Sequence, residues 1–116
     1  MISRFHCGPR MSQVVVHGDT VYIAGQVADS LNAGVAAQTH EILAKIDGLL
    51  AEAGTDKGNI LMTTVYLADI DTFGEMNTVW DAWVLPGNAP PRATVGCQLA
   101  APGYRVEMVI IAAKGT

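Results

Sequence analysis

An arginine and a glutamate, each in an otherwise apolar strand-like run, are the residues of this sequence best suited to chemistry. Arg92 opens the strand-like part of APPRATVGCQL (89–99), and Glu107 lies inside VEMVIIAA (106–113), part of the most apolar predicted strand. Alternate residues of a strand share a face, so Arg92 and Thr94 should point the same way. A rigidly presented guanidinium beside a small hydroxyl is suited to bind both oxygens of a carboxylate.

Each of these two residues also has a purely structural interpretation. Arg92 could be a solvated arginine at the start of a strand, although Pro90 and Pro91 restrict the backbone that presents it. A carboxylate in an apolar strand is costly unless it is paired or used, so Glu107 could belong to a structural ion pair. If the last two strands are neighbours, Glu107 could meet Arg92 or a water beside it, and Arg105 is a competing partner.

Four other residues draw attention because of their predicted surroundings. Asn77 lies on the apolar stripe of a predicted helix, where it should be buried and hydrogen-bonded, either to shape a site or to hold a loop. Gly25 ends a strand, where glycine indicates a close approach of backbone or ligand. Gly96 should leave open space beside Arg92. Cys97 falls with the apolar set and is interpreted as a packed core thiol.

Hydrophobic periodicity predicts an α+β fold in the order β-β-α-β-α-β-β, with two helices on one face of a mixed sheet. One helix ends at Gly54, and the other begins with a Thr72–Glu75 capping box and ends before Pro86-Gly87. The second apolar face of the sheet then needs a partner, which predicts an oligomer. The predicted strands are 13–18, 20–28, 59–69, 92–99 and 104–113, and the first helix is 35–53.

Composition and charge limit the classes of protein to consider. The 116 residues predict a single domain over 1–116, and the 50% hydrophobic content with 16% charged residues again favours burial between subunits. A net charge of −4 without basic runs argues against nucleic-acid binding. No run is apolar enough for a membrane helix or a signal peptide, which predicts a cytoplasmic protein. The cysteines and histidines have no metal-ligand spacing, so no metal is expected.

Several motifs, in the right order over almost the whole chain, resemble one family. They are the hairpin GDTVYIAGQVA (18–28), the helix QTHEILAKIDGLLAEAGT (38–55), TVYLADIDTFGEMNTVWDAW (64–83), PPRATV (90–95) and VEMVIIAA (106–113). The chain resembles the RidA family, also called the YjgF family, of reactive-intermediate deaminases.

This resemblance implies a chorismate-mutase-like fold and a homotrimer with a barrel-like core and clefts between subunits. It implies cofactor-free hydrolysis of 2-imino acids or their enamine tautomers, such as 2-aminoacrylate and 2-iminobutanoate, to 2-oxo acids and ammonia. By position, Arg92 would bind the substrate carboxylate and Glu107 would hold or polarise the attacking water. Thr94, which stands where deaminase members often have cysteine, would line the pocket, and Gly25 and Asn77 would shape it.

The sequence departs from the family pattern near its N-terminus. Active deaminases commonly have Gly-Pro-Tyr-Ser-Gln there, with the tyrosine lining the cleft, whereas this chain has GPRMSQ (8–13). Met11 is expected to contact the substrate instead, and Arg10 could enter the cleft and alter its charge preference. Two alternatives therefore stay open: a non-catalytic module that binds a small carboxylate, and an RNA-cleaving protein, which the acidic composition disfavours.

Overall fold

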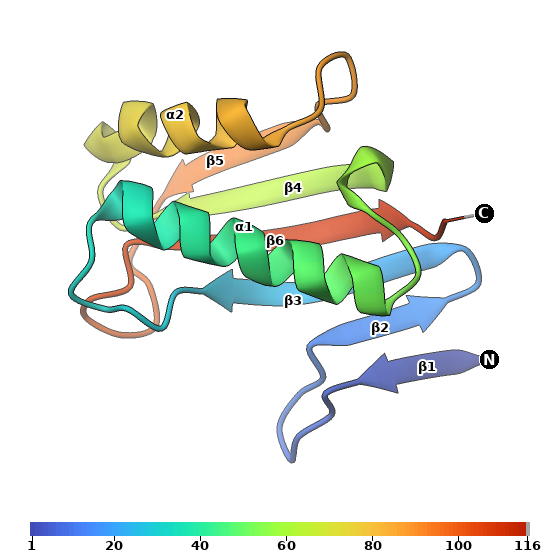
Figure 1. Cartoon of the computed structure of the whole chain (residues 1–116). Helices are drawn as coiled ribbons and strands as arrows, with labels where there is room; N and C mark the ends of the chain where they lie inside the picture. Colours follow the sequence, from blue (N-terminus) through green and yellow to red (C-terminus); the bar gives the residue numbers. More distant parts are fainter. Residues whose placement is uncertain (116) are drawn as a thin grey trace.

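Alternating apolar residues build one six-stranded sheet in the computed structural model, which describes residues 1–115 (Figure 1). The strands are β1 (Ile2–Phe5), β2 (Val14–His17), β3 (Thr20–Val27), β4 (Ile60–Leu67), β5 (Arg92–Gly96) and β6 (Val106–Ala113). The helices are α1 (Val35–Glu52) and α2 (Phe73–Trp83), with short 3-10 turns at Lys57–Asn59 and Ile70–Thr72. The spatial order is β1-β2-β3-β6-β4-β5, and β4–β5 is the parallel pair, so the predicted mixed sheet is confirmed.

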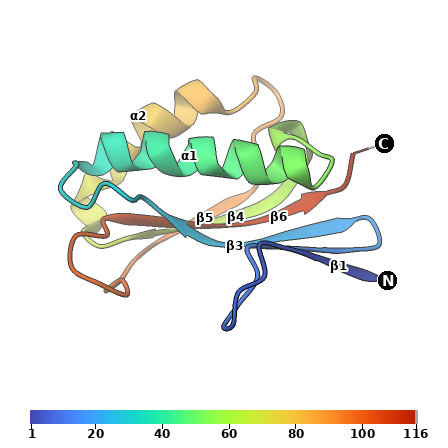
Figure 2. The same cartoon turned by 60° about the horizontal axis from the view of Figure 1, so that its bottom comes forward.

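Both helices cover the same face of the sheet, as predicted (Figure 2). Burial alternates strictly along β6: Val106, Met108 and Ile110 are buried on the helix side, while Glu107 and Val109 face the other way. We call the face without helices the open face. The core lies between the sheet and α1, which buries Ile42, Leu43, Ile46 and Leu50.

The predicted end of the first helix is confirmed at Gly54. This glycine has a φ of +80°, which is the left-handed conformation that favours glycine after a helix. The Gly54 N–H donates to the Ala51 carbonyl at 3.1 Å, and the Thr55 N–H donates to the Leu50 carbonyl at 3.0 Å. These two bonds satisfy carbonyls that the end of α1 would leave unpaired.

The sequence prediction missed the first strand. β1 pairs antiparallel with β2 at the edge of the sheet, so the observed order is β-β-β-α-β-α-β-β. Three of its four residues are exposed, and ISRF lacks the apolar alternation that marks a strand with one buried face. Its pairing depends on the exposed edge of β2 and not on its own pattern.

The last two strands are not neighbours, so the predicted contact between Glu107 and Arg92 is wrong. β5 pairs with β4 at the edge of the sheet, and β6 inserts between β3 and β4. A parallel β4–β5 pair needs a crossover, and α2 supplies it. Within one subunit the helices cover only one face of β4 (Figure 2).

The Thr72–Glu75 capping box is also wrong. The 3-10 turn Ile70–Thr72 leads directly into α2, so Thr72 has a φ of −86° and a ψ of 8° rather than the extended conformation of a capping residue. Its hydroxyl donates to the Asp69 carbonyl at 2.6 Å instead of bonding to the helix N-terminus.

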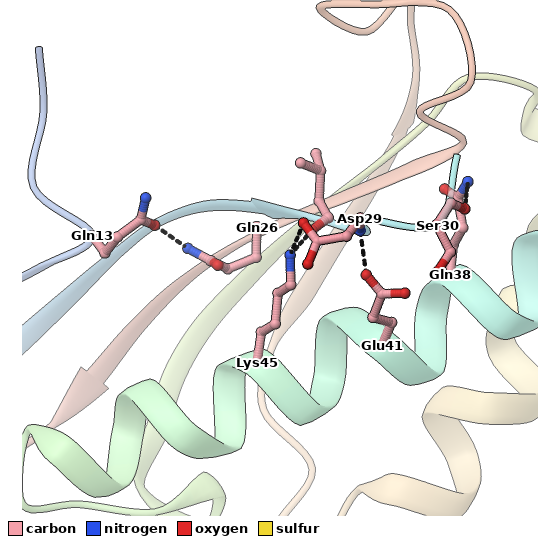
Figure 3. A network of polar contacts seen from close by, with 8 residues as sticks. Gln13, Gln26, Asp29, Ser30, Gln38, Glu41 and Lys45 are labelled. Carbon is pink, nitrogen blue, oxygen red and sulfur yellow. Dashed lines mark hydrogen bonds and ion pairs between the residues drawn. The ribbon is translucent and has the colours of Figure 1, made fainter. Parts of the chain in front are cut away.

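Gln38 of α1 bonds to the loop that follows β3, at Ser30 (Figure 3), and to the loop that precedes β6. Its side chain is 0% exposed, and its Nε2 donates to the carbonyls of Ser30 and Gly103, at 3.2 and 2.8 Å. Its Oε1 accepts the Arg105 N–H at 2.9 Å. These bonds anchor the chain after β3 and before β6, and thereby the ends of β3 and β6 that carry Gly25 and Glu107.

Replacing Gln38 with leucine is expected to lower the free energy of unfolding by about 2–4 kcal/mol, because buried backbone groups lose their partners. Urea denaturation at constant protein concentration would measure the change. The exposed Gln98, replaced by leucine, is the matched control and should shift the midpoint little. An unchanged midpoint for Gln38→Leu would contradict this role.

Candidate functional site

Arg92 starts β5 and extends toward α2, where aromatic rings flank its guanidinium. Its Cζ lies 5.5 Å from the centroid of the Phe73 ring and 5.1 Å from that of the Trp80 ring. Its Nη1 lies 3.9 Å from Sδ of the buried Met76. Cations within about 6 Å of aromatic centroids are attracted to the ring faces. The arginine is therefore half-buried and held by α2, and the solvated interpretation of Arg92 is wrong.

Arg92 has no carboxylate partner within the described residues, whose ion pairs are His6–Glu52 and Lys45–Asp29. Burial lowers the pKa of the guanidinium, whereas the charge of Asp81 raises it. Arginine nevertheless stays protonated at any physiological pH. The result is a fixed, partly desolvated cation with N–H groups available to an anion.

Three oxygen atoms without partners lie on the elements that surround Arg92. The side-chain oxygens of Thr63, Thr94 and Asn77 are buried and accept or donate no hydrogen bond within residues 1–115. Thr63 lies directly opposite Arg92 in the β4–β5 register, and Thr94 is two residues along the same face. Asn77 follows Met76 on α2. The hydrogen bond expected for buried Asn77 is therefore absent for its oxygen, and these atoms are suited to bind water or a polar ligand.

The space predicted beside Gly96 is filled. A Cβ on Gly96 would lie 2.9 Å from Cβ of Ile70, so this glycine permits close packing of the turn before α2. The alternation of β5 itself is as expected, because Arg92, Thr94 and Gly96 all face the helix side. The prediction of open space is wrong because residues distant in sequence pack against the strand.

Glu107 lies on the open face, packed over Gly25. A Cβ on Gly25 would meet the Glu107 carboxylate, with Cδ 3.0 Å away, so the close approach predicted at Gly25 exists and involves a side chain. A register shift between Ile23 and Gln26 marks a bulge in β3 at this point. Arg105 does not pair with Glu107, since its Nε donates to the Ala33 carbonyl at 3.0 Å.

A cavity of about 270 Å³ adjoins Glu107 on the open face. Its lining includes Tyr66, Cys97, Glu107 and Val109, together with Gln98, Leu99 and Ala100. Cys97 is half-buried there, so its prediction as a core thiol is wrong for the single subunit. The alternation of β5 places Cys97 opposite Arg92 and Thr94, and because the helices cover the Arg92 side, Cys97 lies on the open face. The Cys97 N–H still donates to the Leu67 carbonyl at 2.9 Å.

The candidate residues form two groups on opposite faces of the sheet. Arg92, Thr94 and Asn77 lie on the helix side, whereas Glu107 is on the open face beside Gly25. The segment between β1 and β2, which contains Arg10 and the exposed Met11, projects on the open side (Figure 2). A Gln26 Nε2–Gln13 Oε1 hydrogen bond of 2.8 Å ties the end of this segment to β3 (Figure 3). One subunit therefore cannot bring Arg92 and Glu107 to the same small molecule.

Replacing Gly25 with alanine is expected to displace the Glu107 carboxylate while preserving the fold, because the clash involves the end of a flexible side chain. Misplacing a functional group by about 1 Å can cost up to about 10²-fold in rate, so we expect a loss of roughly 10-fold or more in any activity that uses Glu107. Activity and thermal melting would be compared. Gly48→Ala, with nothing within 4 Å of the new Cβ, is the control. Unchanged activity in Gly25→Ala would contradict the prediction.

Sequence reasoning did not assign functional surroundings to Phe73, Trp80, Thr63 or Gln38. Phe73 and Trp80 belong to the apolar stripe that also contains Asn77, and aromatic rings on a stripe facing an arginine are a signal that they could hold it. Among residues 1–115, no three histidine, cysteine, aspartate or glutamate side chains cluster in a way that could hold a metal ion. In the same residues no helix combines the length and apolarity that crossing a membrane requires.

Comparisons with known proteins agree on one family. Residues 1–114 match the family model described as endoribonuclease L-PSP. The chain is 45% identical over 112 residues to the RutC family protein YoaB of Escherichia coli, covering 97% of each chain. It is 34% identical to a 2-iminobutanoate/2-iminopropanoate deaminase of Rattus norvegicus, covering 90% of this chain and 80% of the other. A crystal structure of a YjgF family member from Neisseria meningitidis superposes with a TM-score of 0.95 at 42% identity, covering 100% of this chain and 97% of that one.

Proposed function

Because this chain belongs to the RidA family, also called the YjgF family, we propose that it hydrolyses 2-imino acids and their enamine tautomers to 2-oxo acids and ammonia. The expected substrates include 2-iminobutanoate and 2-aminoacrylate. The observation that carries the proposal is the Arg92 guanidinium, which is fixed between two rings and has no carboxylate partner within the described chain. Its planar N–H fork matches a substrate carboxylate.

The proposed chemistry needs orientation and one activated water. Arg92 would hold the carboxylate, which fixes the neighbouring imine carbon relative to the water. Glu107 would accept a proton as the water oxygen attacks that carbon and the π electrons move to nitrogen. Glu107 then returns this proton to the nitrogen, which gives the carbinolamine. In the collapse, the hydroxyl proton passes through Glu107 to the amino nitrogen, the C–N bond breaks, the oxygen forms the carbonyl, and ammonia leaves. General acid–base assistance of this kind contributes about 10²–10⁴-fold.

We further propose that the active assembly is a homotrimer with sites between subunits. Two features support it. Arg92 and Glu107 lie on opposite faces of the sheet, so a complete site requires Glu107 from a second copy. The open face is also apolar and exposed, with Tyr22 46% exposed and Val95 43% exposed, and such surfaces favour association. Gly25, Arg10 and Met11 would then enter the site with Glu107, whereas Thr94 and Asn77 would enter it with Arg92.

The direct test supplies freshly made imine, because these substrates hydrolyse spontaneously. An amino-acid oxidase would generate the imine from 2-aminobutanoate while 2-oxobutanoate or ammonia release is followed. We expect the protein to accelerate release above the spontaneous rate. Equal rates with and without the protein over a range of protein concentrations would exclude 2-iminobutanoate as a substrate.

Binding of a small carboxylate without turnover is the second candidate. The observation that favours it is the GPRMSQ segment (8–13), which places no tyrosine beside the open face. This candidate predicts tight binding of 2-oxobutanoate together with no acceleration of imine hydrolysis. The proposed enzyme predicts both binding and acceleration.

A further inference from the structure

We infer that Phe73 and Trp80 are positioning residues for Arg92: their rings hold the guanidinium and leave N–H groups free to bind a ligand carboxylate. The inference rests on the proposed function for the identity of the ligand. It assigns to two aromatic residues a role that core packing alone does not require.

The geometry places two π systems and a sulfur around one cation. The ring centroids lie 5.5 and 5.1 Å from Arg92 Cζ, and Met76 Sδ lies 3.9 Å from Nη1. Phe73 and Trp80 are about two helical turns apart on α2, so they share one face of the helix and flank Met76. The start of β5, restricted by Pro90 and Pro91, brings the arginine to this face.

Aromatic partners, unlike a carboxylate partner, leave N–H groups of the Arg92 guanidinium available to a ligand. Burial disfavours the charged guanidinium, so some group must stabilise the cation. A glutamate or aspartate would do so by accepting the same parallel N–H bonds that a substrate carboxylate needs. The negative face of an aromatic ring stabilises the charge without taking up the whole fork. Using rings therefore keeps Arg92 charged, oriented and able to bind.

The two rings differ in a way that makes the inference testable. Trp80 is 5% exposed and belongs to the core, whereas Phe73 is 41% exposed. Replacing Phe73 should therefore disturb folding little. If the rings served only as packing, Phe73→Leu would keep the apolar contact and leave ligand binding unchanged. If ring electrostatics position Arg92, leucine should weaken binding and tyrosine should restore it.

The experiment measures binding of 2-oxobutanoate to the full-length protein by isothermal titration calorimetry, with assembly state and melting temperature checked for each variant. We expect Phe73→Leu to weaken binding about 2- to 30-fold, Phe73→Tyr to remain within about 2-fold of wild type, and Trp80→Phe to weaken it less than Phe73→Leu. Phe5→Leu is the matched control, because Phe5 is a half-buried phenylalanine of β1, at the opposite edge of the sheet from β5. It should bind like the wild type.

The outcomes separate this inference from the proposed function. Wild-type-like binding by Phe73→Leu, or an equal loss in the leucine and tyrosine variants, would overturn the role of the rings. Failure of the wild type to bind 2-oxobutanoate would overturn it as well, since Arg92 would then hold no such carboxylate. If the affinities of the variants for 2-oxobutanoate follow the expected order but the wild type does not accelerate imine hydrolysis, the inference is supported and the proposed enzymatic function is rejected.

Discussion

Replacing Arg92 with alanine is expected to lower kcat/KM for 2-imino acids by about 10²–10³-fold, because removing one partner of a partly buried charge pair costs about 2–5 kcal/mol. The loss should appear with every substrate that carries a carboxylate next to the imine. Arg92→Lys should recover only part of it, since an ammonium cannot form the bidentate fork. Steady-state kinetics with oxidase-generated imines would measure both variants.

Arg105→Ala is the matched control for this change. Arg105 immediately precedes β6, much as Arg92 starts β5, but it is exposed and its Nε donates to a loop carbonyl. Its replacement should leave kcat/KM within about 2-fold of wild type. Retention of full activity in Arg92→Ala, with the fold intact, would contradict the proposed binding of the substrate carboxylate by Arg92.

Replacing Glu107 with glutamine should lower kcat by about 10²–10⁴-fold, because the amide cannot accept a proton from water. Binding of 2-oxobutanoate should change far less, since Arg92 still holds the carboxylate. The pair of measurements therefore distinguishes a residue that acts on water from one that binds substrate. A parallel loss of affinity and rate would instead indicate that Glu107 shapes the pocket.

Mixing Arg92→Ala and Glu107→Gln subunits tests whether the site lies between two subunits. If Arg92 and Glu107 act across an interface, refolding Arg92→Ala with Glu107→Gln subunits should create some interfaces with both native residues, roughly a quarter in randomly mixed trimers. Activity should therefore reappear in the mixture and in neither variant refolded alone. No recovery, after mixed assemblies have been verified by mass spectrometry, would contradict the opposite-face arrangement.

Local periodicity was enough to predict much of the fold. The α1 stripe and its end at Gly54 depend on residues close in sequence, and the structure confirms both. The alternation of β5 placed Arg92 and Thr94 on one face for the same reason. By contrast β1 carries no apolar alternation, and its pairing depends on a neighbouring edge that no local pattern reveals.

The errors about the site arise from contacts between distant residues. Ile70 fills the space beside Gly96. The helices cover the Arg92 side of β5, so Cys97, on the opposite side, lines the open-face cavity beside Glu107. The Thr72 hydroxyl bonds back to Asp69 because a 3-10 turn precedes the helix. Each outcome depends on packing or backbone geometry that residue types and spacing do not specify.

The sequence by itself determined which residues are unusual for their surroundings: an arginine after two prolines, a glutamate in an apolar strand, and a glycine at the end of a strand. These follow from the cost of burying charge and from side-chain alternation, which are local properties. Only the tertiary structure decided which of them can meet. Strand order is set by long-range pairing, so it alone shows that β6 separates β3 from β4 and that Arg92 and Glu107 face opposite sides of the sheet.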